Sequence, residues 1–264
     1  MIHVAAVPYL NSKVLVWGLE KPAPGDEPYT LEFQVPSTLA QSLACGQVDV
    51  GLLSSIEYFT QPNYKIVRGP CVSGRGVMWS IRLFYRGALK KLKRVALDPA
   101  SVTTNALLRI VLEQRLGLRP EYVNLAPGQD AAQRKDLDGM LKIGDPCLAF
   151  HAPGCEALDL LGEWDALTGL PFVFAAWLVR EKTPIGRLGA RLRAARDAGL
   201  QNVGAIAQAH HAEVGLSVER AREYVEKIVR YDLGPQELNG LAEFQRRLVQ
   251  LGILSREKPI ELVD

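Results

Sequence analysis

The sequence has no uninterrupted apolar run approaching the roughly 18 residues that a membrane-spanning helix requires, so we expect no membrane partner. It also lacks the basic region, apolar core and small-residue cleavage site of a secretory signal peptide, which favours a cytoplasmic location. An excess of one charge is missing too, because the formal net charge is only +2. The one basic cluster lacks interleaved aromatic residues and is typical of a solvated turn, so we expect no nucleic-acid partner. This cluster consists of Lys90, Lys91, Lys93 and Arg94.

Cysteine and histidine are scarce and are not arranged as metal ligands. No two of the four cysteines form a CxxC pair, so the sequence predicts neither a zinc site nor a redox motif. The adjacent pair His210-His211 lacks the i, i+4 spacing of a helical metal site. We therefore expect no metal ion, and reduced thiols of the kind found in cytoplasmic proteins. The cysteines are Cys45, Cys71, Cys147 and Cys155.

The first half of the chain does contain several polar turns, each of which follows an apolar strand. Residues 2–7 read as a buried strand that Pro8 ends, and Asn11 and Ser12 are helix-capping types before an apolar helical run. A second apolar strand at 48–53 precedes Ser54 and Ser55, and a third at 94–98 precedes a polar turn and a helix at 106–116. Such junctions lie at the carboxyl ends of strands, where open α/β folds bind ligands and helix N-termini favour anions.

Alternating strands and helices predict a two-lobed α/β protein with mainly parallel sheets. A long strand at 77–85, followed by a fresh strand and helix, indicates a second lobe inserted into the first. Further strands are predicted at 148–150 and 171–179, and the chain looks almost wholly helical from residue 185. The first predicted lobe comprises residues 1–86 and 177–264, and the second comprises residues 87–176. A cleft between them would suit a small anion.

Five short motifs follow one another in a fairly specific order, although each alone is weak. They are Pro8-Tyr9-Leu10-Asn11-Ser12; residues 46–52 with Glu57-Tyr58; Ser73-Gly74-Arg75 with Ser80-Ile81; Ile143-Gly144-Asp145; and residues 168–175. In order and spacing they resemble the chorismate dehydratases of the futalosine route to menaquinone. The resemblance covers residues 2–180, and the helical tail is compatible with it.

The resemblance implies a two-lobed fold like that of the type 2 periplasmic solute-binding proteins, with a helical C-terminal region, used as an enzyme. The implied reaction is loss of water from chorismate, a small dianion, to give 3-(1-carboxyvinyloxy)benzoate without a metal or organic cofactor. Asn11 and Ser80 stand where the family has residues important for the chemistry. Neither is a good base, which fits a family thought to use the substrate's own enolpyruvyl carboxylate for deprotonation. The expected substrate-binding residues are Tyr9, Ser12, Ser54, Ser55, Thr103, Thr104, Asn105, Gly144 and Asp145.

One position departs from the family pattern. Relatives often carry Ser-Arg-Thr-Ser where this chain has residues 101–104, so Val102 replaces an arginine. If that arginine holds a substrate carboxylate, its loss weakens the assignment. If it packs outside the site, nothing is lost.

Structural roles compete with the functional ones at several of these positions. Asn11, Thr103 and Thr104 are also ordinary helix caps, Ser80 suits a structural hydroxyl on a strand, and Asp145 suits a turn cap. Two other functions fit the same fold. One is the 1,4-dihydroxy-6-naphthoate synthase of the same pathway, which carries a histidine base where this chain has residues 143–145. The other is a non-catalytic protein that binds a small anion. The sequence leaves the oligomeric state open.

Overall fold

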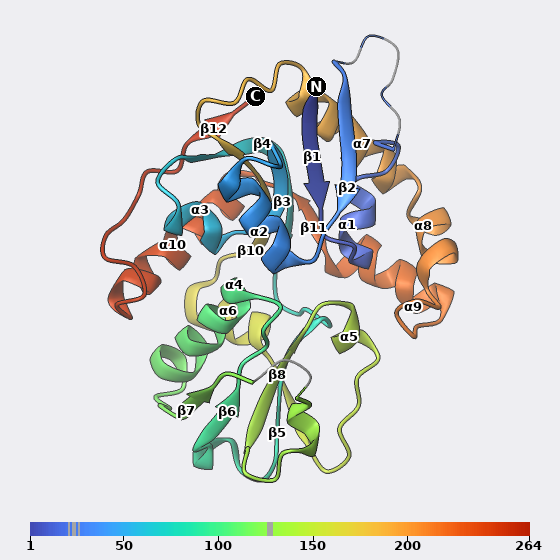
Figure 1. Cartoon of the computed structure of the whole chain (residues 1–264). Coiled ribbons are helices and arrows are strands. Elements are labelled where there is room, and N and C mark those ends of the chain that lie inside the picture. The colour runs from blue at the N-terminus through green and yellow to red at the C-terminus, as the bar shows by residue number, and fades with distance from the viewer. Residues whose placement is uncertain (21, 23–24, 26, 126–128) are drawn as a thin grey trace.

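The computed structural model describes residues 1–20, 22, 25, 27–125 and 129–264, and it contains two β-sheets surrounded by helices. The larger sheet has seven strands in the order β11-β4-β10-β3-β1-β2, with β12 paired to β4. Figure 1 shows this sheet in the upper half of the molecule and the second sheet below it. Its strands are β1 (Ile2–Ala6), β2 (Tyr29–Phe33), β3 (Val50–Ser54), β4 (Tyr64–Gly74), β10 (Phe172–Arg180), β11 (Arg230–Asp232) and β12 (Leu262–Val263).

The larger sheet is mixed rather than parallel. β1 pairs in parallel with both β2 and β3, as strands joined by crossover helices do. β10 runs antiparallel to β3 and β4, and β11 runs antiparallel to β4. The prediction of mainly parallel sheets is therefore wrong at the centre of this sheet. The physical reason is that β10 returns from the second sheet through α6 (Leu160–Thr168), so no strand–helix–strand crossover within the larger sheet sets its direction.

The second sheet has five strands in the order β7-β6-β8-β5-β9, all from the chain between β4 and β10. β5 pairs with β8 and β9, although the predicted boundary at residue 86 puts it in the first lobe. Conversely, β10 belongs wholly to the larger sheet, although its start falls in the predicted second lobe. The strands are β5 (Ile81–Tyr85), β6 (Arg94–Ala96), β7 (Glu121–Val123), β8 (Gly139–Ile143) and β9 (Glu156–Asp159).

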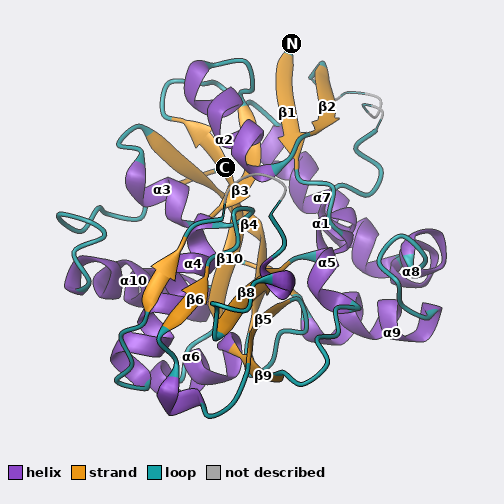
Figure 2. Cartoon of the chain, turned by 60° about the horizontal axis from the view of Figure 1, so that its bottom comes forward, coloured by secondary structure: helices purple, strands orange, loops and turns teal. Residues whose placement is uncertain are grey.

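Helices flank both sheets, as the purple ribbons in Figure 2 show. They are α1 (Leu10–Leu15), α2 (Pro36–Cys45), α3 (Ile56–Thr60), α4 (Val102–Arg109), α5 (Asp145–Leu148), α6 (Leu160–Thr168), α7 (Leu188–Gln201), α8 (Val203–His210), α9 (Val218–Glu223) and α10 (Pro235–Gln250). Short 3-10 turns are η1 (Leu89–Lys91) and η3 (Ala131–Gln133). Two π-helical segments, η2 (Ile110–Arg115) and η4 (Tyr224–Ile228), continue α4 and α9. Among the described residues, no helix is long and apolar enough to cross a membrane.

The C-terminal helices pack closely against the N-terminal part of the chain. α7 approaches α1 so tightly that a Cβ on Gly199 would overlap the carbonyl oxygen of Val14. A cluster of buried rings seats α10 on β10, because Phe172 lies 4.8 Å from Phe244 and 5.1 Å from Trp164 between ring centroids. The helical tail is thus part of the core around the larger sheet.

Three local predictions differ from the structure near the cleft. The expected long strand at 77–85 begins only at Ile81, so Ser80 precedes β5 instead of lying within a strand. Residues 148–150 do not form a strand, because Pro146 at the second position of α5 suits a helix start. The tail also contributes β11 and β12. The crossing from β4 to β5 is held by the Asp159 carboxylate, which accepts the N–H of Met78 at 2.8 Å.

Candidate functional site

A cavity lies between the two sheets. It is lined from the larger sheet by the ends of β1, β3 and β10, and from the other side by the N-terminal turn of α4 and the start of β5. Of the eleven residues predicted for the site, six line it: Tyr9, Asn11, Ser54, Ser80, Thr104 and Gly144. Both residues predicted to take part in the chemistry are among them.

The turn into α1 is built differently from the prediction. The helix begins at Leu10, and its N-cap is Tyr9, whose side chain makes no capping hydrogen bond. Asn11 therefore lies in the first helical turn and lines the cavity instead of capping the helix. Ser12 is fully buried, and its hydroxyl donates to the carbonyl oxygens of Val7 and Tyr9 at 2.5 and 2.6 Å. Ser12 thus stabilises the turn and does not line the cavity.

Asp145 caps α1 from the other side of the cleft. Its carboxylate oxygens accept the backbone N–H of Leu10 at 2.9 and 3.1 Å, across 135 positions of chain. Burial raises the pKa of this carboxyl to about 6, partly offset by that hydrogen bond. The preceding residue, Gly144, has φ +66° and ψ −159°, and a Cβ there would lie 3.3 Å from the Tyr9 ring. The Leu10 N–H at the start of α1 therefore binds a protein carboxylate.

Thr103 makes a matching contact on the opposite side. Its hydroxyl accepts the N–H of Ile56 at 3.0 Å, so a residue of α4 caps α3. Thr103 is 1% exposed and does not line the cavity, whereas the neighbouring Thr104 does. Two predicted substrate-binding residues, Asp145 and Thr103, thus close the cleft by capping helices of the larger sheet.

Two other predicted binding residues also have structural partners outside the cavity lining. The Ser55 hydroxyl donates to the Val173 carbonyl oxygen at 2.7 Å. Asn105 forms two hydrogen bonds with the backbone of Asp98, at 2.8 and 3.1 Å. Asp98 in turn accepts the N–H of Ala100 and Ile143, so Asn105 shapes the loop that carries the wall of the cavity.

Asn11 and Ser80 meet through Tyr224, a residue of the C-terminal tail. The hydroxyl of Tyr224 donates to Ser80 Oγ at 2.9 Å and accepts from Asn11 Nδ2 at 3.3 Å. Tyr224 is fully buried, begins the π-helical segment η4, and stacks on Trp79 with 6.3 Å between ring centroids. Arg220 covers the indole, with its guanidinium carbon 3.7 Å from the ring centroid.

The walls of the cavity carry almost no ionisable groups. Among the described lining residues, Tyr9 is the only titratable side chain, and none is Lys, Arg or His. Burial, with the nearby carboxylates of Asp98 and Asp145, raises the pKa of Tyr9 to about 12, so its hydroxyl stays protonated at neutral pH. The site therefore offers hydroxyl and amide hydrogen-bond donors but no side-chain base at its surface.

Sequence reasoning missed two residues here, Tyr224 and Ser101. Ser101 lines the cavity and is the N-cap of α4, where its Oγ accepts the N–H of Thr104 at 3.1 Å. A capping serine before a helix was a usable signal for it. The hydroxyl of Tyr224 was the only local hint of polarity on an otherwise apolar helix face.

Val102 is the first residue of α4, is 55% exposed and is not part of the cavity lining. The replacement of a family arginine at this position therefore leaves the described lining of the cavity unchanged.

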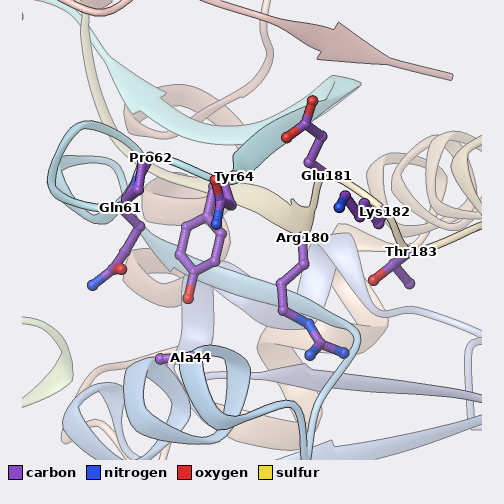
Figure 3. A pocket seen from close by; sticks show the side chains of 9 residues that line it. Ala44, Gln61, Pro62, Tyr64, Arg180, Glu181, Lys182 and Thr183 are labelled. Atoms are coloured by element: carbon purple, nitrogen blue, oxygen red, sulfur yellow. The ribbon is translucent and has the colours of Figure 1, made fainter.

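A second, more open hollow lies elsewhere on the larger sheet, between the end of α2, the start of β4 and the end of β10. Figure 3 shows Arg180 and Tyr64 directed toward Ala44, with Glu181 turned the other way. The Arg180 guanidinium pairs with the Asp49 carboxylate at 3.2 Å, so its charge is already matched. None of the eleven predicted residues lines this hollow. Across the described residues, no group of three or more His, Cys, Asp or Glu side chains is placed to hold a metal ion.

Comparisons with known proteins show the family to which the chain belongs. The model of a protein family described as menaquinone biosynthesis matches residues 2–250. A chorismate dehydratase of Thermus thermophilus is 31% identical over 233 residues, covering 81% of this chain and 84% of the relative. A chorismate dehydratase of Campylobacter jejuni is 23% identical and covers 94% of this chain and 97% of the relative.

Solved structures support the fold. Protein AF1704 of Archaeoglobus fulgidus aligns with a TM-score of 0.74 at 18% identity, covering 96% of this chain and 98% of its own. The alkanesulfonate-binding protein SsuA of Xanthomonas axonopodis pv. citri, solved with MOPS bound, aligns with a TM-score of 0.70 at 16% identity, covering 97% and 94%. The predicted fold like that of the periplasmic binding proteins is confirmed.

Proposed function

Because the chain belongs to the menaquinone biosynthesis family, we propose that it dehydrates chorismate to 3-(1-carboxyvinyloxy)benzoate in the cavity between its two sheets. The observation that carries the proposal is the meeting of Asn11 and Ser80 at this cavity, from two different sides of the cleft. The enzyme is then a carbon–oxygen lyase. We further propose that it serves the futalosine route and works in the cytoplasm.

The reaction needs little from the protein beyond orientation and hydrogen bonding. The ring carbon that bears the ether loses its proton, the C–H electron pair enters the ring, and the neighbouring carbon loses its hydroxyl group. The proton and the hydroxyl group leave in sum as water, and the ring becomes aromatic, which supplies the driving force. Holding one reactive conformer is worth about 7 kcal/mol of barrier in favourable cases.

The absence of an ionisable base among the described cavity-lining residues agrees with deprotonation by the substrate's own enolpyruvyl carboxylate. Tyr9 is protonated at neutral pH, and the Asp145 carboxylate is engaged by the Leu10 N–H. In this proposal Asn11 donates a hydrogen bond to the substrate, and Ser80 donates one to the departing hydroxyl group.

Two carboxylates of the substrate would be held by neutral donors. Tyr9, Ser54, Ser101 and Thr104 line the cavity, and the last two lie at the N-terminal end of α4, where the helix dipole favours an anion. Since such donors supply less attraction than a buried cation, correct placement of each hydroxyl matters more for binding here.

The test is turnover of chorismate by the wild type and by Asn11→Ala and Ser80→Ala, with binding followed separately by calorimetry. Removing one positioned donor of this kind costs about 100-fold in kcat. Ser73→Ala is the matched control, because Ser73 is equally buried but its hydroxyl donates to the Arg230 carbonyl at 3.3 Å, outside the cavity lining. Wild-type binding of chorismate without turnover would support a binding protein instead. Full activity in both alanine variants would remove these residues from the mechanism.

A further inference from the structure

We propose that Tyr224 is a positioning residue that fixes Ser80 as a hydrogen-bond donor to the substrate. The same residue holds Asn11 in a fixed position relative to Ser80. This inference rests on the proposed function and adds a residue that lies far along the chain from both partners. Its hydroxyl is the shared atom between Asn11, on α1, and Ser80, at the crossing into β5. Tyr224 does not line the cavity, so it acts through these two residues.

The direction of the hydrogen bonds carries the argument. A tyrosine hydroxyl has a single hydrogen, and here it is donated to Ser80 Oγ. The hydroxyl oxygen accepts from Asn11 Nδ2, so both roles of the group are engaged. Ser80 accepts from Tyr224, so its own hydrogen remains available for another acceptor, such as a substrate in the cavity that Ser80 lines. The same bond leaves Asn11 a second N–H and its carbonyl oxygen for the substrate.

The protonation state of Tyr224 keeps this direction constant. Complete burial raises the pKa of its hydroxyl far above the usual value of 10, with the Asp145 carboxylate adding to the effect. The phenol therefore stays neutral and keeps its hydrogen at neutral pH. A hydroxyl on a water-exposed ring would exchange partners freely.

The fold fixes the ring as well as the hydroxyl group. Tyr224 opens the π-helical segment, in which its carbonyl accepts the N–H of Val229 five residues on. Such wide turns are often found at functional sites, because they displace one side chain from the regular helix face. Trp79, directly before Ser80, stacks on the Tyr224 ring at 25° between ring planes, and the Arg220 guanidinium lies over the Trp79 ring. Tyr224 and Ser80 are thus held by adjoining contacts.

Tyr231 provides a matched control. It is also buried, at 4% exposure, and lies near Tyr224 on β11. Its hydroxyl oxygen has no hydrogen-bond partner among the described residues. Removing the hydroxyl group from either tyrosine keeps the ring and its packing. Activity should therefore fall only where the lost hydroxyl group makes a hydrogen bond that positions another residue.

The experiment compares Tyr224→Phe with Tyr231→Phe on chorismate. We expect Tyr224→Phe to lower kcat by about 10- to 100-fold with KM changed less than about threefold, because it removes a bond that orients the reacting groups. Tyr231→Phe should keep wild-type kcat. In the Ser80→Ala background the loss caused by Tyr224→Phe should shrink by at least about threefold, since the partner is already gone. Equal kcat in the two phenylalanine variants, or undiminished loss in the double variant, overturns the inference.

A second readout separates this inference from the proposed function. The side-chain amide signal of Asn11, assigned in ¹⁵N spectra by its absence in Asn11→Ala, should move in Tyr224→Phe and stay in place in Tyr231→Phe. If the wild type does not convert chorismate, the proposed function fails, and this signal still reports the Tyr224 contact. If the Asn11 signal does not move when the Tyr224 hydroxyl group is removed, the inference is contradicted, whether or not the protein converts chorismate.

Discussion

Replacing Thr103 with valine distinguishes a helix cap from a substrate contact. Valine has the shape of threonine but cannot accept a hydrogen bond, so Thr103→Val leaves the buried N–H of Ile56 without its partner. An unsatisfied buried donor costs about 1–3 kcal/mol, and we expect about 2 kcal/mol here. For a chain of this length that corresponds to a fall in Tm of about 4–8 °C.

The matched variant is Thr104→Val, one residue further along α4. The Thr104 hydroxyl bonds to Ser101 Oγ at 3.0 Å, and Thr104 lines the cavity. We expect it to raise KM for chorismate by about 10-fold, the value of one neutral hydrogen bond, with a smaller fall in Tm. Thermal unfolding by circular dichroism and steady-state kinetics are measured on both variants. A Thr103→Val protein with wild-type Tm, or with the larger increase in KM, refutes this division of roles.

Three further predictions concern the closed arrangement of the cleft and the C-terminal strand. Folding raises the pKa of Asp145 from 3.8 to about 6, so the folded protein favours the protonated carboxyl. The resulting contribution to the free energy of unfolding is complete below about pH 4 and is lost as the pH rises through 6. The unfolding free energy of the wild type relative to Asp145→Asn should therefore rise when urea titrations are moved from pH 7 to pH 4, and a constant difference would contradict the assignment. Gly144→Ala should lower the free energy of unfolding by about 1–3 kcal/mol, because the φ and ψ of Gly144 suit only glycine and a Cβ there would contact the Tyr9 ring. The control is Gly204→Ala, which places a Cβ in open space on α8 and should be neutral or stabilising. Lys258→Met should speed hydrogen exchange in β12, since the ammonium donates to the carbonyls of residues 58, 61 and 64 at 2.8–3.1 Å; unchanged exchange would show that the strand is held by other contacts.

Local sequence patterns were sufficient to predict the elements that bury one face. The apolar runs predicted at 2–7 and 48–53 appear in the structure as β1 and β3, close to their predicted places. These features depend on neighbours within a few residues, so a single sequence contains the necessary information.

The closed cleft depends on contacts that no local pattern contains. Asp145 caps a helix 135 positions away, and Tyr224 reaches Asn11 across 213 positions. In the sequence Asp145 resembles a turn residue and Tyr224 a core residue, and both descriptions are locally correct. Only the approach of the two sheets assigns the Asp145 carboxylate to Leu10 and the Tyr224 hydroxyl to Ser80. At the helix start that carries Asn11 and Ser12, the Asp145 carboxylate likewise caps the Leu10 N–H, a contact that the local sequence does not show.

The most direct test of the central claim is to incubate the wild-type protein with chorismate alone and identify the product. Ring aromatisation is followed by ultraviolet absorbance, and the product is characterised by proton NMR and mass spectrometry. We predict conversion to 3-(1-carboxyvinyloxy)benzoate with loss of one molecule of water, at a rate that Asn11→Ala and Ser80→Ala each reduce by about 100-fold. Chorismate that stays intact after prolonged incubation with folded protein would contradict the account.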